Sequence, residues 1–223
     1  MILRSDQPLT LIGGGAVSDA GFDAALAHAP RIVAADGGAR HALARGQMPE
    51  AVIGDMDSIR AGEISALPAD RLHRIDEQDS TDFDKVLRNV ETPLFLGLGF
   101  LGARLDHELA VLNTLVRQPH KRGVLIGERD IALLLPPALR LDLAPGTRVS
   151  LFPFGPASGT SDGLRWPIGG IGFSPDGRVG TSNIADGAVY LAMTTAKMLL
   201  MLPTDCLGAM LDGLAEAPRW DSL

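Results

Sequence analysis

The chain has 223 residues, 46% of them hydrophobic, which is enough for one large or two small domains with a buried core. Its formal net charge of −7 at pH 7 argues against a general nucleic-acid-binding protein, because such proteins present a basic face. The single cysteine, Cys206, excludes an intrachain disulfide, and no secretory signal is visible at the start, so we expect a cytoplasmic protein. The most apolar stretch, residues 187–203, is interrupted by Lys197, which argues against a membrane span.

The first half of the chain alternates short apolar runs with helix-compatible segments. Strands are expected at residues 9–12, 31–35, 51–53, 72–75, 94–100 and 123–126. Helices are expected from the glycine-rich turn Gly13–Gly15 to about residue 29, at 39–45, after residue 79 and after residue 104. This alternation predicts a Rossmann-like, doubly wound parallel α/β domain.

From about residue 131 the pattern changes to short β-type segments separated by glycine and proline. Strands are expected at residues 139–143, 147–152, 163–168, 178–181, 188–193 and 197–202. Such a pattern is typical of a small β-sandwich. We therefore expect an α/β domain at residues 1–128 followed by an all-β domain at residues 129–223.

Acidic side chains are concentrated between Gly54 and Lys85. Five acids and no base occur from Asp76 to Asp84, and Gly54-Asp55-Met56-Asp57-Ser58 precedes them. Crowded carboxylates oppose one another's ionisation, and a bound divalent cation would offset that cost. Magnesium prefers carboxylate oxygens and often shares its coordination shell with phosphates. The alternative is a solvated acidic loop ahead of a helix.

The helix expected after this acidic run has one apolar stripe. The stripe comprises Phe83, Val86, Leu87 and Val90. Asp79 or Ser80 is the expected N-cap. Thr81 and Lys85 share a face four residues apart, near a helix start that favours anions. In the last helix of the α/β half, Leu105, Leu109, Leu112 and Val116 are expected to form the apolar face.

Several aspartates follow directly after expected strands. Because ligands of open α/β sheets bind outside the carboxyl ends of the strands, these aspartates are expected to converge on one edge. They are Asp36, Asp55, Asp57, Asp79, Asp82 and Asp106. Gly13–Gly15 either lets a phosphate approach the backbone or is a plain tight turn.

Four segments, in order and spacing, resemble the thiamine pyrophosphokinases. They are Ala35-Asp36-Gly37-Gly38, Gly54–Ser58, Gln78–Lys85 and Gly102–His107. Gly163–Trp166 and Thr181–Asn183 resemble the shorter thiamine-site motifs of that family. The chain departs from the family pattern at Ala103, where a second glycine is usual, and at Arg165 and Pro167 beside Trp166.

The resemblance implies a homodimer that transfers the pyrophosphoryl group of ATP to the hydroxyl of thiamine, giving thiamine diphosphate and AMP. It implies a magnesium site at Asp55, Asp57, Asp79 and Asp82. It implies ATP contacts by Asp36, Gln78, Thr81 and Asp106. It implies catalytic roles for Asp57, Asp82, Lys85 and Arg104, with Asp57 or Asp82 as the proton acceptor. It implies thiamine contacts by Trp166, Ser182 and Asn183 near the dimer interface.

Purely structural roles are the alternative for some of these residues. The alternative for His107 and Trp166 is packing, and the alternative for Asp36 and for Ser182-Asn183 is a turn. Two rival functions also stand. One is a pyrophosphokinase acting on a hydroxymethylpterin, and the other is a non-catalytic thiamine- or nucleotide-binding protein. The sequence leaves open the number of magnesium ions, the nucleotide preference, and the roles of Gly13–Gly15 and Trp220.

Overall fold

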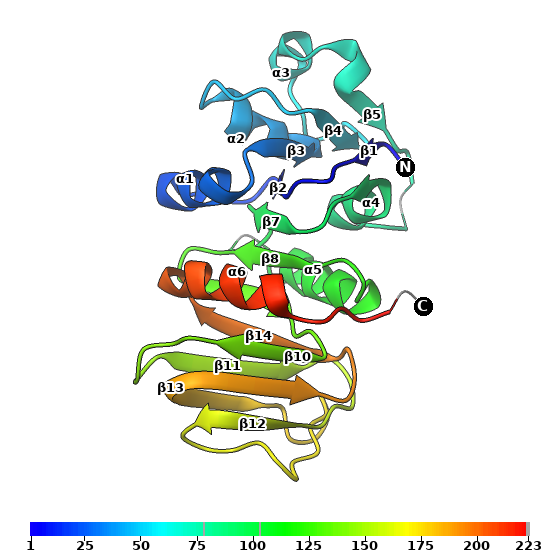
Figure 1. Cartoon of the computed structure of the whole chain (residues 1–223). Coiled ribbons are helices and arrows are strands. Elements are labelled where there is room, and N and C mark those ends of the chain that lie inside the picture. The colour runs from blue at the N-terminus through cyan, green and yellow to red at the C-terminus, as the bar shows by residue number, and fades with distance from the viewer. Residues whose placement is uncertain (78, 103, 222–223) are drawn as a thin grey trace. The chain divides into compact units, whose positions relative to one another are not determined.

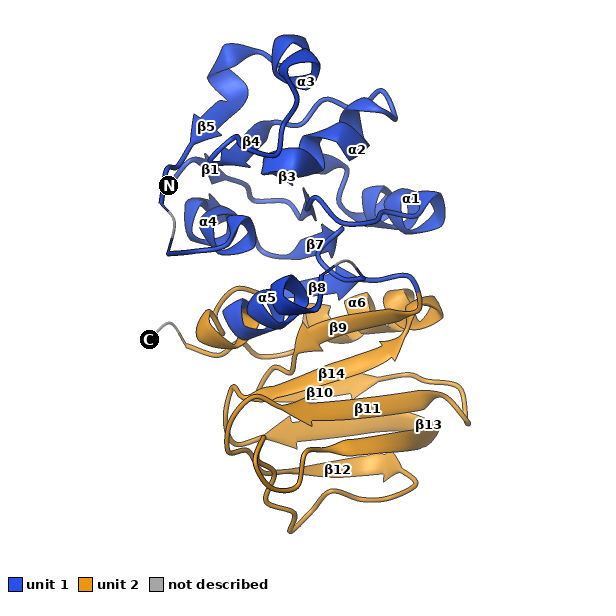
Figure 2. Ribbon diagram, turned by 180° about the vertical axis from the view of Figure 1, so that it is seen from behind, with its two compact units in different colours: residues 1–114, 123–128 blue, residues 115–122, 129–223 orange. Residues whose placement is uncertain are grey.

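The computed structural model describes residues 1–77, 79–102 and 104–221 and divides the chain into two compact units (Figures 1 and 2). Unit 1 comprises residues 1–114 and 123–128, and unit 2 comprises residues 115–122 and 129–223. Within the described ranges, no helix is both long enough and apolar enough to cross a membrane. The predicted domain boundary after residue 128 stays a prediction.

Unit 1 is built on parallel strands in the spatial order β8-β7-β2-β3-β4-β5. These are β2 (Leu9–Ile12), β3 (Arg31–Ala35), β4 (Ala51–Gly54), β5 (Leu72–Arg74), β7 (Phe95–Leu98) and β8 (Gly123–Ile126). Every residue of β2, β4, β7 and β8 is buried, which explains their continuous apolar runs, because parallel sheets are covered on both faces. The predicted α/β class of this half is confirmed.

The helices of unit 1 lie between these strands in the chain. They are α1 (Asp19–His28), α2 (Ala39–Leu43), α3 (Ala61–Ala66), α4 (Asp82–Asn89) and α5 (Leu105–Arg117), with the 3₁₀ turns η1 (Asp36–Gly38) and η2 (Ala69–Arg71). A short parallel pair, β1 (Leu3–Arg4) with β6 (Val90–Glu91), was not predicted, because two-residue strands leave no periodic signal.

The sheet changes its direction of winding between β2 and β7. From β2 the chain steps outward through β3 and β4 to β5, then returns through α4 to β7 on the other side of β2. Loops at the carboxyl ends of such neighbouring strands diverge and leave room for a ligand. Here these ends carry Gly13–Gly15 and Gly99, joined by hydrogen bonds from the Gly13 amide to the Leu98 carbonyl (2.7 Å) and from the Gly15 amide to the Gly99 carbonyl (2.8 Å).

Unit 2 is antiparallel and β-rich, as predicted. Its strands are β9 (Asp130–Leu134), β10 (Ala138–Leu141), β11 (Arg148–Pro153), β12 (Gly159–Leu164), β13 (Thr181–Met193) and β14 (Met198–Pro203), followed by η3 (Thr204–Cys206) and α6 (Leu207–Glu216). The first part of β13 pairs with β11, and its last part pairs with β10 and β12. β14 lies between β11 and β9.

Strand bounds in unit 2 differ from the prediction in three places. Residues 163–168 fall mostly outside β12, residues 178–180 belong to no strand, and β9 was not predicted. β12 is a half-exposed, polar strand, so its sequence carries little apolar alternation. The long strand β13 is interrupted by Gly187, whose φ of 144° no other residue type adopts easily, and that glycine made one strand look like two.

The predicted apolar face of α5 is confirmed at Val116 but wrong at Leu105 and Leu109. Leu105 and Leu109 are 71% and 51% exposed, and the buried apolar residues of this helix are Val111, Leu115 and Val116. Spacing alone identifies a stripe of leucines but does not say what covers it. The first turns of α5 therefore present large apolar side chains to solvent.

Candidate active site

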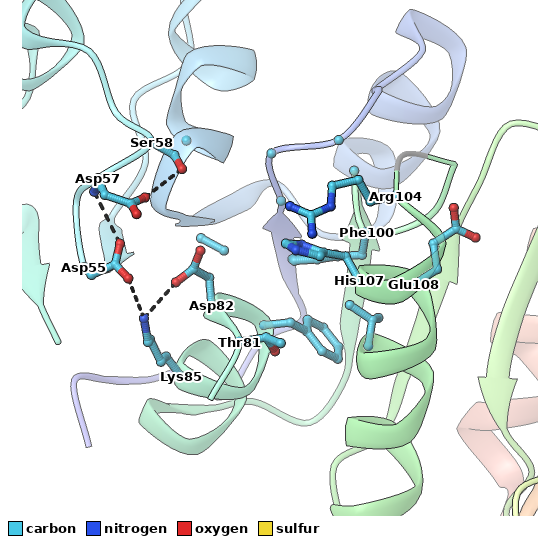
Figure 3. Close-up of a pocket in the computed structure, with 18 of the residues that line it drawn as sticks. Asp55, Asp57, Ser58, Thr81, Asp82, Lys85, Phe100, Arg104, His107 and Glu108 are labelled. Carbon is cyan, nitrogen blue, oxygen red and sulfur yellow. Dashed lines mark hydrogen bonds and ion pairs between the residues drawn. The ribbon is translucent and has the colours of Figure 1, made fainter. Parts of the chain in front are cut away.

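A cavity of about 560 Å³ opens in unit 1 at the carboxyl ends of the strands, beside the point where the winding reverses (Figure 3). Its walls are the glycine turns after β2 and β7, the loop after β4, the start of α4, and the first turn of α5. Figure 3 shows Asp55, Asp57, Asp82 and Lys85 on one side of the cavity and Arg104, His107 and Glu108 on the other.

Three aspartates from two neighbouring strands meet at this edge. One carboxylate oxygen each of Asp36, Asp55 and Asp57 lies within 4.8 Å of the others. The approach depends on Gly54, because a Cβ there would lie only 2.7 Å from the Cβ of Asp36. The predicted convergence of these three residues is therefore observed.

Asp36 is the most constrained member of this group. It is 1% exposed and has a φ of 42°, in the left-handed region that aspartate tolerates better than most residues. Its Oδ2 accepts a hydrogen bond from the Ser58 amide (3.1 Å), whereas its buried Oδ1 has no hydrogen-bond partner among the residues that the structure describes. Burial, reinforced by the charges of neighbouring carboxylates, raises the pKa of Asp36 to about 6.

The loop after β4 fixes the other two carboxylates. Asp55 Oδ1 accepts from the Asp57 amide (3.3 Å), and the Ser58 hydroxyl donates to Asp57 Oδ1 (2.8 Å). Met56 between them has a φ of 69°, so the loop turns sharply and both aspartates line the same cavity.

Lys85 joins this loop to α4. Its ammonium is 2% exposed and donates to Asp55 Oδ2 and to Asp82 Oδ1, each at 3.1 Å. Burial opposes the charge of Lys85, but the two carboxylates outweigh it and raise its pKa above the ordinary value. Burial also opposes the ionisation of Asp55, yet the bonds from Lys85 and from the Asp57 amide lower its pKa. At Asp82 burial dominates and raises the pKa.

The start of α4 differs from the prediction. The N-cap is Thr81, whose Oγ1 accepts from the Asp84 amide (3.3 Å), and neither Asp79 nor Ser80 caps the helix. Serine, threonine and aspartate are all good N-caps, so the sequence Asp-Ser-Thr-Asp did not specify which one caps. Capping by Thr81 places Asp82 in the first turn, where its carboxylate reaches Lys85.

Other candidates are less closely grouped. Thr81 and Arg104 line the cavity, whereas Asp79 and Asp106 are exposed and do not line it in the described part of the chain. Asp106 accepts two hydrogen bonds from the Arg104 guanidinium (3.1 and 2.6 Å), which hold the pKa of Asp106 below its ordinary value. Gln78, like Ala103, lies outside the described residues.

Sequence reasoning missed several lining residues. They are Ser58, Arg40, His107 and Glu108. His107 is exposed rather than packed. Arg40 could have been found, since it follows the Asp36-Gly37-Gly38 segment within one helical turn.

In unit 2, Asn183 holds the backbone of Trp166. The Asn183 amide donates to the Trp166 carbonyl (2.6 Å), and its Oδ1 accepts from the Trp166 amide (3.2 Å) and from the Ile184 amide (2.9 Å). Asn183 is 1% exposed while Trp166 is 54% exposed, so Trp166 is not a core residue. Ser182 is exposed on β13, and therefore Ser182-Asn183 is a strand segment and not a turn.

Comparison with known proteins agrees with these motifs. Residues 22–126 match the family described as "Thiamin pyrophosphokinase, catalytic domain". "Thiamine pyrophosphokinase 2" of Arabidopsis thaliana is 30% identical over 170 residues, which cover 68% of this chain and 64% of that protein. "Thiamine pyrophosphokinase 1" of Oryza sativa subsp. japonica is 35% identical over 158 residues, 62% of this chain and 60% of that protein. The chain thus spans less than two thirds of the length of either relative.

Solved structures share the fold of the chain. A thiamine pyrophosphokinase from Bacillus subtilis superposes with a TM-score of 0.74 at 20% identity, covering 89% of this chain and 100% of that one. The yeast thiamin pyrophosphokinase superposes with a TM-score of 0.71 at 17% identity, covering 91% and 88%. Residues 22–126 are therefore similar to the catalytic domain of the thiamin pyrophosphokinases, and most of the chain shares the fold of these solved structures.

Proposed function

We propose that the protein is a thiamine pyrophosphokinase, which transfers the pyrophosphoryl group of ATP to the hydroxyl of thiamine and releases AMP. The observation that carries the proposal is the cluster of Asp36, Asp55 and Asp57 at the edge of a cavity next to the winding reversal. One buried oxygen of Asp36 in this cluster has no hydrogen-bond partner in the described part of the chain. Uncompensated carboxylates in this position are costly, and a cation with a bound phosphate chain would offset the cost.

The residues present fit a magnesium ion. Hard carboxylate oxygens are its preferred protein ligands, and the Asp36, Asp55 and Asp57 oxygens lie within 4.8 Å of one another. We assign the metal to Asp55, Asp57 and Asp82, with the Asp36 carboxylate close to Asp55 and Asp57. Asp79, implied by the resemblance, is the weakest member of the set, because it is exposed and does not line the cavity in the described part of the chain. When bound, magnesium would neutralise and bridge phosphate oxygens.

The transfer forms a bond between the thiamine hydroxyl oxygen and the β-phosphorus of ATP, and breaks the bond from that phosphorus to the oxygen leaving with AMP. Asp57 or Asp82 would accept the hydroxyl proton. Lys85 and Arg104 would offset charge on the phosphates, and Thr81 and Gln78 would frame the nucleotide. Positioning and electrostatic stabilisation supply most of the rate in such reactions.

We assign thiamine binding to unit 2. The exposed ring of Trp166 presents a π face that can bind the positively charged thiazolium ring. The Arg165 guanidinium already makes a cation–π contact with this ring, at 5.9 Å from the ring centroid. Ser182, on the neighbouring strand, is exposed and available to the substrate. Asn183 acts through the backbone of Trp166, because its side chain is buried and engaged.

We further propose a homodimer with the thiamine site near its interface. The exposed leucines Leu105 and Leu109 on α5 support it, since exposed apolar side chains grouped on one helix are typical of association surfaces. Leu109→Asp should convert the dimer to monomer in sedimentation velocity. An unchanged sedimentation coefficient would remove α5 from the interface.

The decisive assay is mass-spectrometric detection of thiamine diphosphate and AMP from ATP, magnesium and thiamine. Asp82→Asn should abolish turnover while the far-UV circular dichroism stays unchanged. Asp70→Asn, which removes an exposed carboxylate outside the cavity lining, is the matched control and should keep activity. Product from a hydroxymethylpterin but not from thiamine would favour the pterin alternative, and MgATP binding without any product would favour a non-catalytic binding protein.

A further inference from the structure

We propose that Arg40 is an additional phosphate-binding residue of this cavity, contacting the phosphate chain of a nucleoside triphosphate beside the carboxylate-bound metal. The inference rests on the proposed function, because it assumes that the cavity takes such a nucleotide. Arg40 lies on α2, lines the cavity, and belongs to none of the motifs that pointed to the site.

The first argument concerns charge. The other two cations that line the cavity among the described residues are already paired with carboxylates: Lys85 with Asp55 and Asp82, and Arg104 with Asp106. The guanidinium of Arg40 donates instead to the neutral carbonyl of Gly14, and it forms no ion pair with any residue that the structure describes. Its positive charge is therefore the least compensated in the cavity and the most available to an anion.

The second argument concerns position. Arg40 Nη1 lies 3.4 Å from the point that a Cβ on Gly37 would occupy, and Ser58 Cβ lies 3.2 Å from the same point. The Ser58 hydroxyl in turn donates to the Asp57 carboxylate (2.8 Å). The missing side chain of Gly37 thus lets the guanidinium and the Asp57 loop approach each other closely. A phosphate bound to a metal on Asp57 would lie within reach of Arg40.

The third argument concerns preorganisation. The Gly14 carbonyl accepts a hydrogen bond from Arg40 and so orients its guanidinium. Gly14 lies in a turn that is held by hydrogen bonds from the Gly13 amide to β7 and from the Gly15 amide to Gly99. One donor of the guanidinium bonds to the Gly14 carbonyl, and its other N–H groups make no hydrogen bond to any described residue, so they can bind phosphate oxygens in a fork. This arrangement also gives the Gly13–Gly15 turn a function, which is to hold a cation in place.

The test is direct calorimetric titration of MgATP and of AMP into the full-length protein and its variants. Arg40→Gln keeps an amide donor for the Gly14 carbonyl but removes the charge, so it should weaken MgATP binding about ten- to a hundredfold. AMP, which lacks the β- and γ-phosphates, should lose less affinity. Arg40→Lys should restore part of the MgATP affinity. Arg4→Gln, which removes an exposed arginine outside the cavity lining, is the control for net charge and should bind like the parent.

Three results would overturn the inference: MgATP binding by Arg40→Gln that equals the parent, equal losses for MgATP and AMP, or no MgATP binding by the parent. Salt provides a further readout, because removing a phosphate contact should make the affinity less sensitive to ionic strength. A different result would refute the proposed function. A parent that binds MgATP but makes no thiamine diphosphate refutes the activity, while a selective loss in Arg40→Gln still supports the phosphate contact.

Discussion

Replacing Asp36 with asparagine should stabilise the metal-free protein at neutral pH. Asp36 is buried, one of its oxygens has no hydrogen-bond partner within the described ranges, and the Asp55 and Asp57 carboxylates lie close by. Asparagine keeps the shape, accepts the bond from the Ser58 amide, and places an amide donor against the neighbouring carboxylates. It also tolerates the left-handed backbone at φ 42°.

The magnitude follows from the pKa of about 6, against an ordinary value of 3.8. Between these two pH values the folded protein retains a proton that the unfolded chain has released. The free energy of unfolding therefore falls as the pH rises through this range and levels off above it. At roughly 1.4 kcal/mol per pH unit, ionised Asp36 costs the folded state about 3 kcal/mol at pH 7. Asp36→Asn should recover up to that amount at pH 7 and little of it near pH 4.

Urea denaturation with a chelator present, at pH 4, 5.5 and 7, measures the difference between parent and variant directly. Adding magnesium should reverse the order at pH 7, because the parent gains binding free energy that the variant cannot match. The matched control is Asp70→Asn, which should show no pH-dependent difference. A stability difference that is constant with pH, or a variant less stable than the parent at pH 7 without metal, would refute the reasoning.

Three further changes test neighbouring features. Lys85→Met removes the buried cation between two carboxylates and should cost about 3–5 kcal/mol in urea denaturation, part of which magnesium restores; no loss would mean that the ammonium does not balance them. Thr81→Ala removes the N-cap of α4 and should lower the free energy of unfolding by about 1 kcal/mol, whereas Thr81→Ser should be neutral. Asn183→Ala, in a Trp220→Phe background, should lower the fluorescence anisotropy of Trp166 and raise KM for thiamine while kcat holds; unchanged anisotropy would contradict its positioning role.

The strands of unit 1 could be predicted closely from the sequence because each is a short apolar run buried on both faces and ended by glycine or aspartate. β2, β3 and β8 begin and end where the pattern placed them. The helix stripe of α4 was also readable, since Phe83 and Val86 are buried as their spacing indicated. These features are local, so a window of a few residues contains the information.

Features that depend on partners far away in the chain could not be predicted. The exposure of Leu105 and Leu109 depends on what packs against α5, and spacing within the helix carries no such information. Likewise, nothing in the sequence near Asn183 shows that its amide is engaged by the backbone at position 166, seventeen residues away. Arg40 was missed for a different reason. A single arginine on a short helix belongs to no motif, and only the structure shows that its guanidinium donates to the Gly14 carbonyl.

The acidic site depends as much on missing side chains as on charged ones. A Cβ on Gly54 would lie 2.7 Å from that of Asp36, and a Cβ on Gly38 would lie 2.0 Å from the Ile12 carbonyl oxygen, so neither strand end could approach its neighbour as it does. Gly37 likewise allows Arg40 to approach the loop after β4 closely, because a Cβ there would lie 3.2 Å from Ser58 Cβ and 3.4 Å from Arg40 Nη1. The glycines and the aspartates of these motifs therefore act together. The glycines allow the strand ends to approach, and this sets the distances between the carboxylates, which repel one another. Under the proposed function, that enforced repulsion would favour the binding of a cation, and lengthening any of these contacts should weaken metal binding even with every carboxylate in place.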